Sequence, residues 1–146
     1  MVNTFFPPWR GGAETYVYNL AKYLVASGNE VKVISASDPL PPGESIVDGV
    51  EVYRLKSYGR IYGVPIVAGL PKVLADLDAE VLHANFPNPY NASIASLASL
   101  LRDVPSVLTW HNDLPPVTLT AKIIVYIHDN LIAPVYLRNF KRIIST

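Results

Sequence analysis

The chain of 146 residues contains no cysteine, which excludes disulfide bonds, thiolate metal sites and a cysteine nucleophile. Its three histidines, His83, His111 and His128, are scattered along the sequence, so no metal site is expected. It also lacks net charge, with 12 Lys and Arg against 12 Asp and Glu, whereas nucleic-acid-binding proteins normally carry a basic surplus. Because 50% of the residues are hydrophobic and only 16% are charged, we expect one folded domain with a substantial core.

Targeting and membrane-spanning signals are also missing. Residues 81–101 are long enough to span a bilayer and carry no charge, but they contain Pro87, Pro89, three Asn, three Ser and His83. The first twelve residues have no basic region, apolar run or cleavage site of a signal peptide. We therefore expect a soluble cytoplasmic chain, for which a peripheral contact with the inner face of a membrane stays open.

What the sequence does contain is an alternation of strand-like and helix-like segments. Strands are expected at residues 1–5, 31–34, 50–55, 80–84, 106–110 and 142–145. Helices are expected after Gly11-Gly12 up to a cap at Gly28, and at residues 65–77, 90–101 and 118–140, the last with a break near Pro134; residues 38–45 and 85–88 are expected to be loops. This order predicts an α/β fold, a Rossmann-like, doubly wound and mainly parallel sheet with helices on both faces.

In such folds ligands bind beyond the carboxyl ends of the strands, which is where the candidate site residues lie. Gly11 and Gly12 join the first strand to its helix, where backbone N–H groups can approach an anion closely, although a simple tight turn explains the pair equally well. Asn85 and Phe86 open the proline-stiffened loop after the fourth strand. This loop is either a wall that binds hydroxyl groups or a rigid turn.

His111, Asn112 and Asp113 directly follow the strand at residues 106–110, and here a functional interpretation outweighs a structural one. Since the three polar loops are expected at one edge of the sheet, their convergence is the argument for a site. His83, inside an apolar strand, is expected to be a hydrogen-bonded core residue. His128 is expected to form a solvated pair with Asp129, and the basic C-terminal helix to have a solvated face and a buried opposite side, with an amphipathic surface for anionic lipid as the less favoured interpretation.

These segments resemble glycosyltransferase family 4. The resemblance rests on FPPWRGGAE at residues 6–14, the GNEVKV strand at 28–33, LHAN at 82–85, TWHND at 109–113 and RIIS at 142–145. Asn29, Asn85 and Asn112 stand where the family usually has His, His and a small residue. Gly-Gly-x-Glu and T-x-H-x-D are modest motifs individually, but their joint spacing along the whole chain is fairly specific.

The resemblance implies the GT-B architecture, in which two Rossmann-like domains face each other across a cleft. Residues 1–146 would be the amino-terminal, acceptor-side domain of a retaining, metal-independent transferase, and its donor-binding domain, which carries an E-x7-E motif, would be absent from this chain. By the same resemblance, the Gly11 and Gly12 amides face the donor diphosphate, His111 lies near the transferred sugar, and the loop after Asn85 lines the acceptor pocket. No cofactor or metal is expected, the donor is a nucleotide-sugar, the acceptor is a glycan, a lipid-linked or a small molecule, and the isolated chain is expected to be inactive.

Two other functions stay open. A nucleotide-binding Rossmann-like module without transferase activity would use Asp38, near the end of the second strand, for a ribose, but the chain lacks GxGxxG. A stand-alone interaction domain would need a finished sheet edge, whereas both ends of this sequence look cut.

Overall fold

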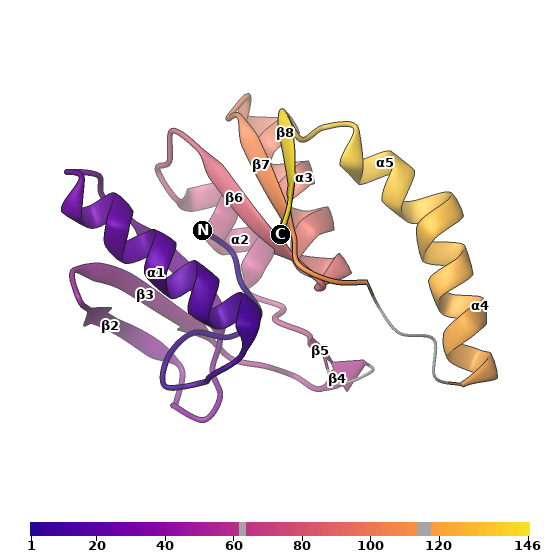
Figure 1. The fold of residues 1–146 in the computed structure, drawn as a ribbon, viewed down its shortest axis with the longest axis horizontal. Coiled ribbons are helices and arrows are strands. Elements are labelled where there is room, and N and C mark those ends of the chain that lie inside the picture. The colour runs from indigo at the N-terminus through magenta and orange to yellow at the C-terminus, as the bar shows by residue number, and fades with distance from the viewer. Residues whose placement is uncertain (62–63, 114–117) are drawn as a thin grey trace. The chain divides into compact units, whose positions relative to one another are not determined.

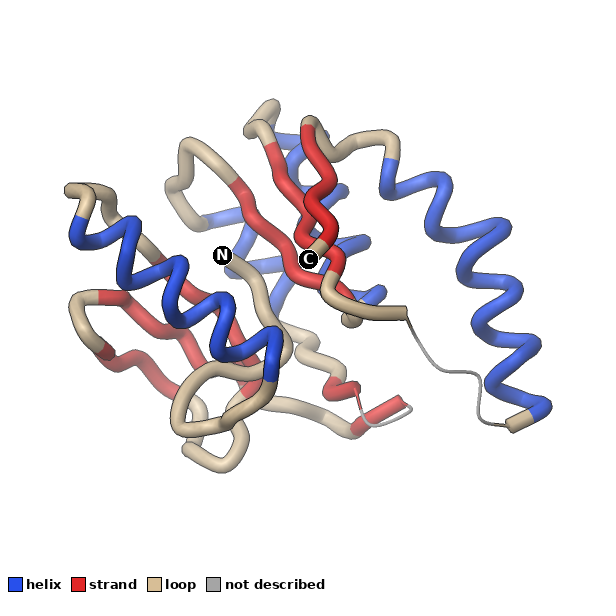
Figure 2. The backbone as a smooth tube through the Cα atoms, in the orientation of Figure 1, coloured by secondary structure: helices blue, strands red, loops and turns tan. Residues whose placement is uncertain are grey.

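The computed structural model describes residues 1–61, 64–113 and 118–146. These residues form two compact units, Met1–Leu77 and Asp78–Thr146, each with its own three-stranded sheet and its own helices (Figure 1). Helices and mainly parallel strands alternate along the chain (Figure 2), which confirms the predicted α/β, Rossmann-like class. No helix of the described residues has the length and apolar character needed to cross a bilayer.

The first unit is built on a sheet with the strand order β1-β3-β2. Its elements are α1 (Gly12–Ala26), β1 (Lys32–Ala36), β2 (Gly43–Val47), β3 (Val50–Leu55), the short pair β4 (Arg60–Ile61) and β5 (Val64–Pro65), and α2 (Leu70–Asp76). β1 and β3 are parallel, whereas β2 is antiparallel to β3. The predicted first strand, residues 1–5, is reduced to a parallel bridge between Val2 and Ile34.

The core of the first unit lies between α1 and one face of this sheet. Side chains alternate along β3, so that Val50 and Val52 are buried against Val17 and Ala21 of α1. Helix α1 ends where it was predicted to end, because Gly28 takes the left-handed conformation, with φ of +88°. This packing fixes the position of the amino-terminal end of α1, where Gly11 and Gly12 lie.

The second unit is built on the fully parallel sheet β6-β7-β8. Its elements are β6 (Leu82–Phe86), α3 (Pro89–Arg102), β7 (Ser106–Trp110), α4 (Leu119–Ile127), a π-helical stretch His128–Ile132 (η1), α5 (Ala133–Leu137) and β8 (Arg142–Ser145). Helix α3 packs on β6, β7 and α5 through small side chains such as Ala95, Ser96 and Ser99. At its start the Asn88 side chain accepts a hydrogen bond from the backbone N–H of Asn91, at 3.0 Å.

Three predictions of local structure are wrong. The predicted loop at 38–45 overlaps the strand β2, which begins at Gly43; four of its five residues are exposed, so it lacks the hydrophobic alternation that marks a strand. The helix predicted over 65–77 begins only at Leu70, because Pro71 fits the first helical turn and residues 64–65 pair with β4. Asn85 and Phe86 belong to β6, so the loop predicted at 85–88 is shorter.

Candidate functional site

The polar site residues of the second unit gather where its three parallel strands end. In the register of the sheet, Asn85 of β6 lies opposite Thr109 of β7, and Trp110 lies opposite Ser145 of β8. The backbone N–H of His111 then donates to the Phe86 carbonyl, which carries the pairing one residue past β7. The ends of the three strands are therefore held in register, and the residues that follow them lie at one edge.

His111 is held at this edge by hydrogen bonds from two other strand ends. Its Nε2 is 3.1 Å from Asn85 Oδ1, and its Nδ1 is 3.1 Å from the Thr146 hydroxyl oxygen. The neutral tautomer that satisfies both contacts has Nε2–H donating to Asn85 and Nδ1 accepting from Thr146. Partial burial also lowers the pKa of His111, which favours this uncharged form.

His83 and Thr109 form a second polar contact on the same face of the sheet. His83 lies two residues before Asn85, and Thr109 two residues before His111, so all four side chains point to one side. His83 Nε2 is 2.7 Å from the Thr109 hydroxyl oxygen, and burial lowers the pKa of His83 to about 4. This agrees with the prediction of a hydrogen-bonded histidine inside the strand.

The opposite face of the same strand ends is aromatic. Phe86 stacks on Trp110 with ring centroids 3.8 Å apart, and the Trp110 indole N–H donates to Asp113 Oδ1 at 2.8 Å. Asp113 and Asn112 are themselves exposed. The stacked pair therefore anchors the start of the predicted ligand-binding segment, residues 111–113, to the sheet.

The predicted pair of His128 and Asp129 is present, but His128 is buried, so the prediction that the pair is solvated is wrong for the histidine. The π-helical stretch η1 begins at His128, and the ring lies 5.9 Å from the Phe86 ring. Its two nitrogens are 2.7 Å from Asp129 Oδ1 and 2.9 Å from the Tyr136 hydroxyl oxygen. Burial raises the pKa of Tyr136 well above its usual range, so this phenol stays protonated and the cluster has the character of a structural network.

Asn85 and Phe86 are each only 1% exposed, so neither presents a side chain to a ligand. Their contacts instead place other groups: Asn85 holds the His111 ring, and Phe86 supports Trp110. The direct contact with substrate predicted for these two residues does not fit this burial, whereas His111, Asn112 and Asp113 remain accessible.

Gly11 and Gly12 lie at the start of α1 in the first unit. Gly11 is the N-cap residue, and the carboxylate of Glu14 folds back over it, into the space that a Cβ atom on Gly11 would need. A Cβ atom on Gly12 would meet nothing within 4 Å. The backbone at Gly12 is therefore open, while Glu14 occupies the space beside Gly11.

Sequence reasoning missed two residues that support these segments. Arg54 is 6% exposed, and its guanidinium donates to the Pro7 carbonyl at 2.8 Å and to the Ser45 hydroxyl, which ties the loop before Gly11 to the sheet. Thr146 lies beside His111. An arginine in an alternating strand is a weak signal in the sequence, and Thr146 carried none.

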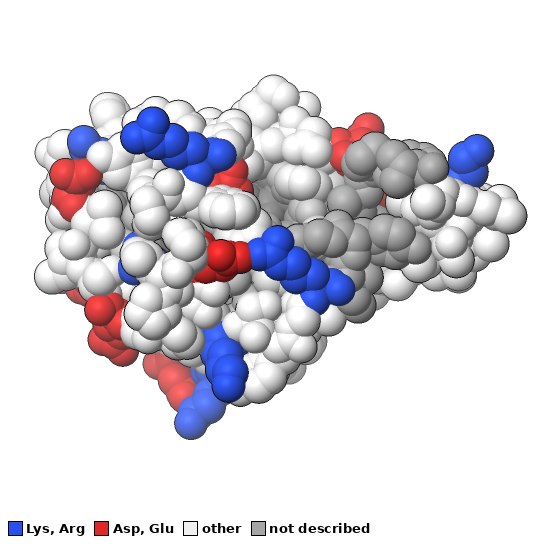
Figure 3. All heavy atoms as spheres, turned by 90° about the horizontal axis from the view of Figure 1, so that it is seen from below, with Lys and Arg blue, Asp and Glu red and all other residues white. Residues whose placement is uncertain are grey.

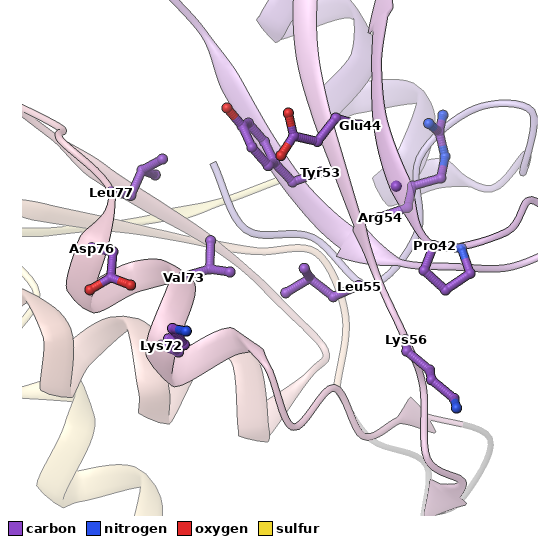
Figure 4. A pocket seen from close by; sticks show the side chains of 11 residues that line it. Pro42, Glu44, Tyr53, Arg54, Leu55, Lys56, Lys72, Val73, Asp76 and Leu77 are labelled. Atoms are coloured by element: carbon purple, nitrogen blue, oxygen red, sulfur yellow. The ribbon is translucent and has the colours of Figure 1, made fainter.

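The first unit also contains a groove of about 540 Å³ between β3 and α2 (Figure 4). Tyr53, Leu55, Val73 and Leu77 form its walls, while the guanidinium of Arg54 points away from it. The groove contains none of the predicted site residues. Asp38, the ribose-binding candidate of the alternative function, forms an ion pair with Arg60.

A family model described as Glycosyltransferase Family 4 matches residues 10–146. The chain belongs to glycosyltransferase family 4. A search of curated proteins finds no match. Membership confirms the resemblance noted in the sequence and identifies this as a glycosyltransferase-type domain, for which the substrates in general are a sugar donor and an acceptor.

Among residues 1–61, 64–113 and 118–146, no three His, Asp or Glu side chains lie together in a way that could hold a metal ion.

Proposed function

We propose that residues 1–146 are the amino-terminal, acceptor-side domain of a retaining, metal-independent glycosyltransferase of the GT-B type. The enzyme transfers a sugar, a hexose in the simplest case, from a nucleotide-sugar to a glycan, a lipid-linked or a small-molecule acceptor. The observation that carries the proposal is the His111 ring, held by strand ends β6 and β8 in a family 4 chain. The proposal includes a cytoplasmic location with a peripheral contact to the inner membrane face.

His111 is the catalytic residue of this proposal, and Nδ1 is the atom that faces the substrate. Nε2 is bound to the buried Asn85, whereas Nδ1 contacts the exposed hydroxyl of Thr146, which a ligand hydroxyl can replace. Asn85 and Phe86 act as positioning residues. Asn112 and Asp113 bind substrate from the exposed segment after His111, and the Gly11 and Gly12 amides stabilise the negative charge of the leaving diphosphate.

The test compares three His111 variants of the natural full-length enzyme with a panel of sugar nucleotides. We expect His111→Ala to lower kcat by about 10²- to 10³-fold, as the loss of a positioned hydrogen-bonding group does. His111→Asn keeps an acceptor near the Nδ1 position and should retain more activity than His111→Gln, which keeps a donor near Nε2. Near-normal transfer by His111→Ala would remove His111 from the mechanism, and equal loss in Asn and Gln variants would contradict the assignment of Nδ1.

The domain assignment has a separate test. An antibody against residues 1–146 should detect a native protein well above 16 kDa, larger by about one further domain. Residues 1–146 alone are expected to show no transfer, because the donor-binding domain is missing. A native band at 16 kDa, or reproducible turnover of a sugar nucleotide by the isolated chain, would contradict the assignment.

A further inference from the structure

Arg54 of β3 is a buried charged side chain without an acidic partner. It is 6% exposed, and among residues 1–61, 64–113 and 118–146 no other Lys, Arg, Asp or Glu is buried. None of the ion pairs found in this part of the chain includes Arg54. On the face shown in Figure 3, by contrast, acidic and basic side chains lie next to one another at the surface. Because a buried cation without a carboxylate costs folding free energy, stability does not explain this arginine.

Arg54 lies at the carboxyl end of β3, on the face of the sheet that α1 covers. The alternation along β3 puts it on the same side as Val50 and Val52, which pack against α1. Its guanidinium points away from the groove on the opposite face (Figure 4). Burial lowers the pKa of Arg54, and no neighbouring acid offsets this effect. The guanidinium nevertheless stays charged, because arginine does not lose its proton in proteins.

The partners of this guanidinium are two neutral oxygen atoms. Nη2 donates to the Pro7 carbonyl at 2.8 Å, and Nη1 donates to the Ser45 hydroxyl. Ser45 is exposed and Pro7 is half-buried, so water can hydrogen-bond to both oxygens when the arginine is replaced. The fold therefore does not need Arg54 to satisfy these acceptors. What the arginine provides is a link between β3 and a segment 47 residues away along the chain.

That segment is the loop that leads into α1, and Pro7 lies at its centre. The Phe6 ring is buried in the core beside Pro7, and the Trp9 backbone N–H donates to the Phe6 carbonyl at 3.3 Å. From Pro7 the chain reaches Gly11 in four residues, a span of at most about 14 Å even when fully extended. The hold of Arg54 on the Pro7 carbonyl is therefore close enough to Gly11 to affect where the amino end of α1 begins.

We propose that Arg54 is a positioning residue for the donor diphosphate: by holding the Pro7 carbonyl, it sets the direction of the Gly11 and Gly12 amides. This inference rests on the proposed function, which assigns these amides to the charge of the leaving diphosphate. The guanidinium acts through the loop and does not itself contact the donor. Amides that are aimed before the reaction stabilise developing charge without a cost of reorganisation. Arginine suits this role because its two terminal nitrogens reach two acceptors at once, which the single nitrogen of lysine does not.

The kinetic test uses Arg54→Lys in the natural full-length enzyme. We expect kcat to fall about tenfold and the donor KM to change less than about twofold, because the amides act on charge that develops in the transition state. Arg54→Met, which cannot donate a hydrogen bond, should lower kcat at least as much, while thermal unfolding shows both variants folded. An unchanged kcat of the folded variants, with or without a lower melting temperature, would reduce Arg54 to a structural residue and overturn the inference.

The matched control is Arg138→Lys. Arg138 also donates to a proline carbonyl, that of Pro134 at 2.8 Å, but it is exposed and belongs to the other unit. Its replacement should leave kcat unchanged, and a loss equal to that of Arg54→Lys would contradict the inference. Ser45→Ala removes the other acceptor of Arg54 and keeps the contact with Pro7, so kcat should stay within about twofold of the unchanged enzyme.

The position of the loop has a readout that needs no sugar nucleotide. Trp9 is 37% exposed, its ring centroid lies 4.7 Å from that of Phe5, and the chain has one other tryptophan, Trp110. In residues 1–146 with Trp110→Phe, acrylamide should quench Trp9 fluorescence more strongly after Arg54→Lys and equally after Arg138→Lys. Unchanged quenching after Arg54→Lys would overturn the inference even if transfer falls. Absence of transfer by the unchanged full-length enzyme would contradict the proposed function, whereas Trp9 would still show whether Arg54 holds the loop.

Discussion

The His83 ring lies inside a strand, where a positive charge is strongly disfavoured. Burial lowers its pKa to about 4, from 6.5 for an exposed histidine, and Thr109 occupies its Nε2 at 2.7 Å. The ring is therefore uncharged at neutral pH, and it adds no positive charge beside the neutral His111 ring. One consequence is that protonation of His83 at low pH should destabilise the fold.

We predict that stability falls as the pH drops from about 6.5 to 4. In that window the unfolded chain binds a proton at His83 that the folded chain does not, so protonation favours unfolding; above 6.5 neither state is protonated. The shift corresponds to a loss of about 3 kcal/mol over the window. Urea unfolding at several pH values measures it, and His83→Gln, which cannot titrate, should lose less stability. Parallel curves for the two proteins would contradict the prediction.

At the scale of elements, the two ends of α1 make opposite demands on glycine: Gly12 is the first residue of the helix, and Gly28 lies two residues after its last residue, Ala26. Gly12 has helical backbone, and a Cβ atom there would meet open space, whereas Gly28 ends the helix at φ of +88°, also with nothing within 4 Å. Space is thus equal at the two sites, and only the backbone conformation differs. Substituting each glycine by alanine therefore distinguishes an effect on ligand binding, expected at Gly12, from an effect on helix stability, expected at Gly28.

Gly12→Ala is expected to stabilise the protein by about 0.5–1 kcal/mol, because alanine favours helix over the unfolded chain. Gly28→Ala, the matched control, should destabilise it by about 1 kcal/mol, since a side chain is strained at positive φ. Thermal unfolding measures both. If the Gly12 amide faces the donor diphosphate, Gly12→Ala should also lower the transfer rate of the full-length enzyme despite its higher melting temperature. An unchanged transfer rate would contradict a contact between the Gly12 amide and the donor diphosphate.

The elements that were predicted well from the sequence are those that bury one face in a core, because burial produces a recognisable pattern of apolar residues. β3 alternates between buried and half-buried residues, and α3 is rich in alanine and serine. At the turn between β2 and β3, Asp48 and Gly49 adopt positive φ, 49° and 81°. β2 could not be recognised, since it is exposed and depends on β3 for its hydrogen bonds. Pairing partners distant in the chain are the part of the fold that local patterns do not reveal.

From the sequence, the site could be predicted only to the extent that its residues lie at the ends of parallel strands. Because parallel strands end at the same edge, the meeting of Asn85 with His111 followed from the order of elements. The inward burial of Asn85, the stacking of Phe86 on Trp110 and the contact of Thr146 with His111 depend on which face each side chain occupies. A register error of one residue reverses that face, so these contacts needed the structure.

At the scale of the whole molecule, the proposed metal independence gives a direct test. We expect EDTA to leave the transfer rate of the full-length enzyme unchanged, and added Mg²⁺ or Mn²⁺ to have no effect, because in the proposed mechanism backbone amides and the donor-binding domain stabilise the charge of the diphosphate. Steady-state rates with and without EDTA measure this. A loss of activity that Mg²⁺ or Mn²⁺ restores would contradict the proposal.

β8 stands at the end of its sheet, and all four of its residues are exposed. Such a strand exposes a row of backbone donors and acceptors that can pair with another extended chain. The exposed apolar side chains of Ile143 and Ile144 favour such pairing. Among the described residues no strand pairs with the outer side of β8, so the backbone donors and acceptors on that side can hydrogen-bond to another extended segment.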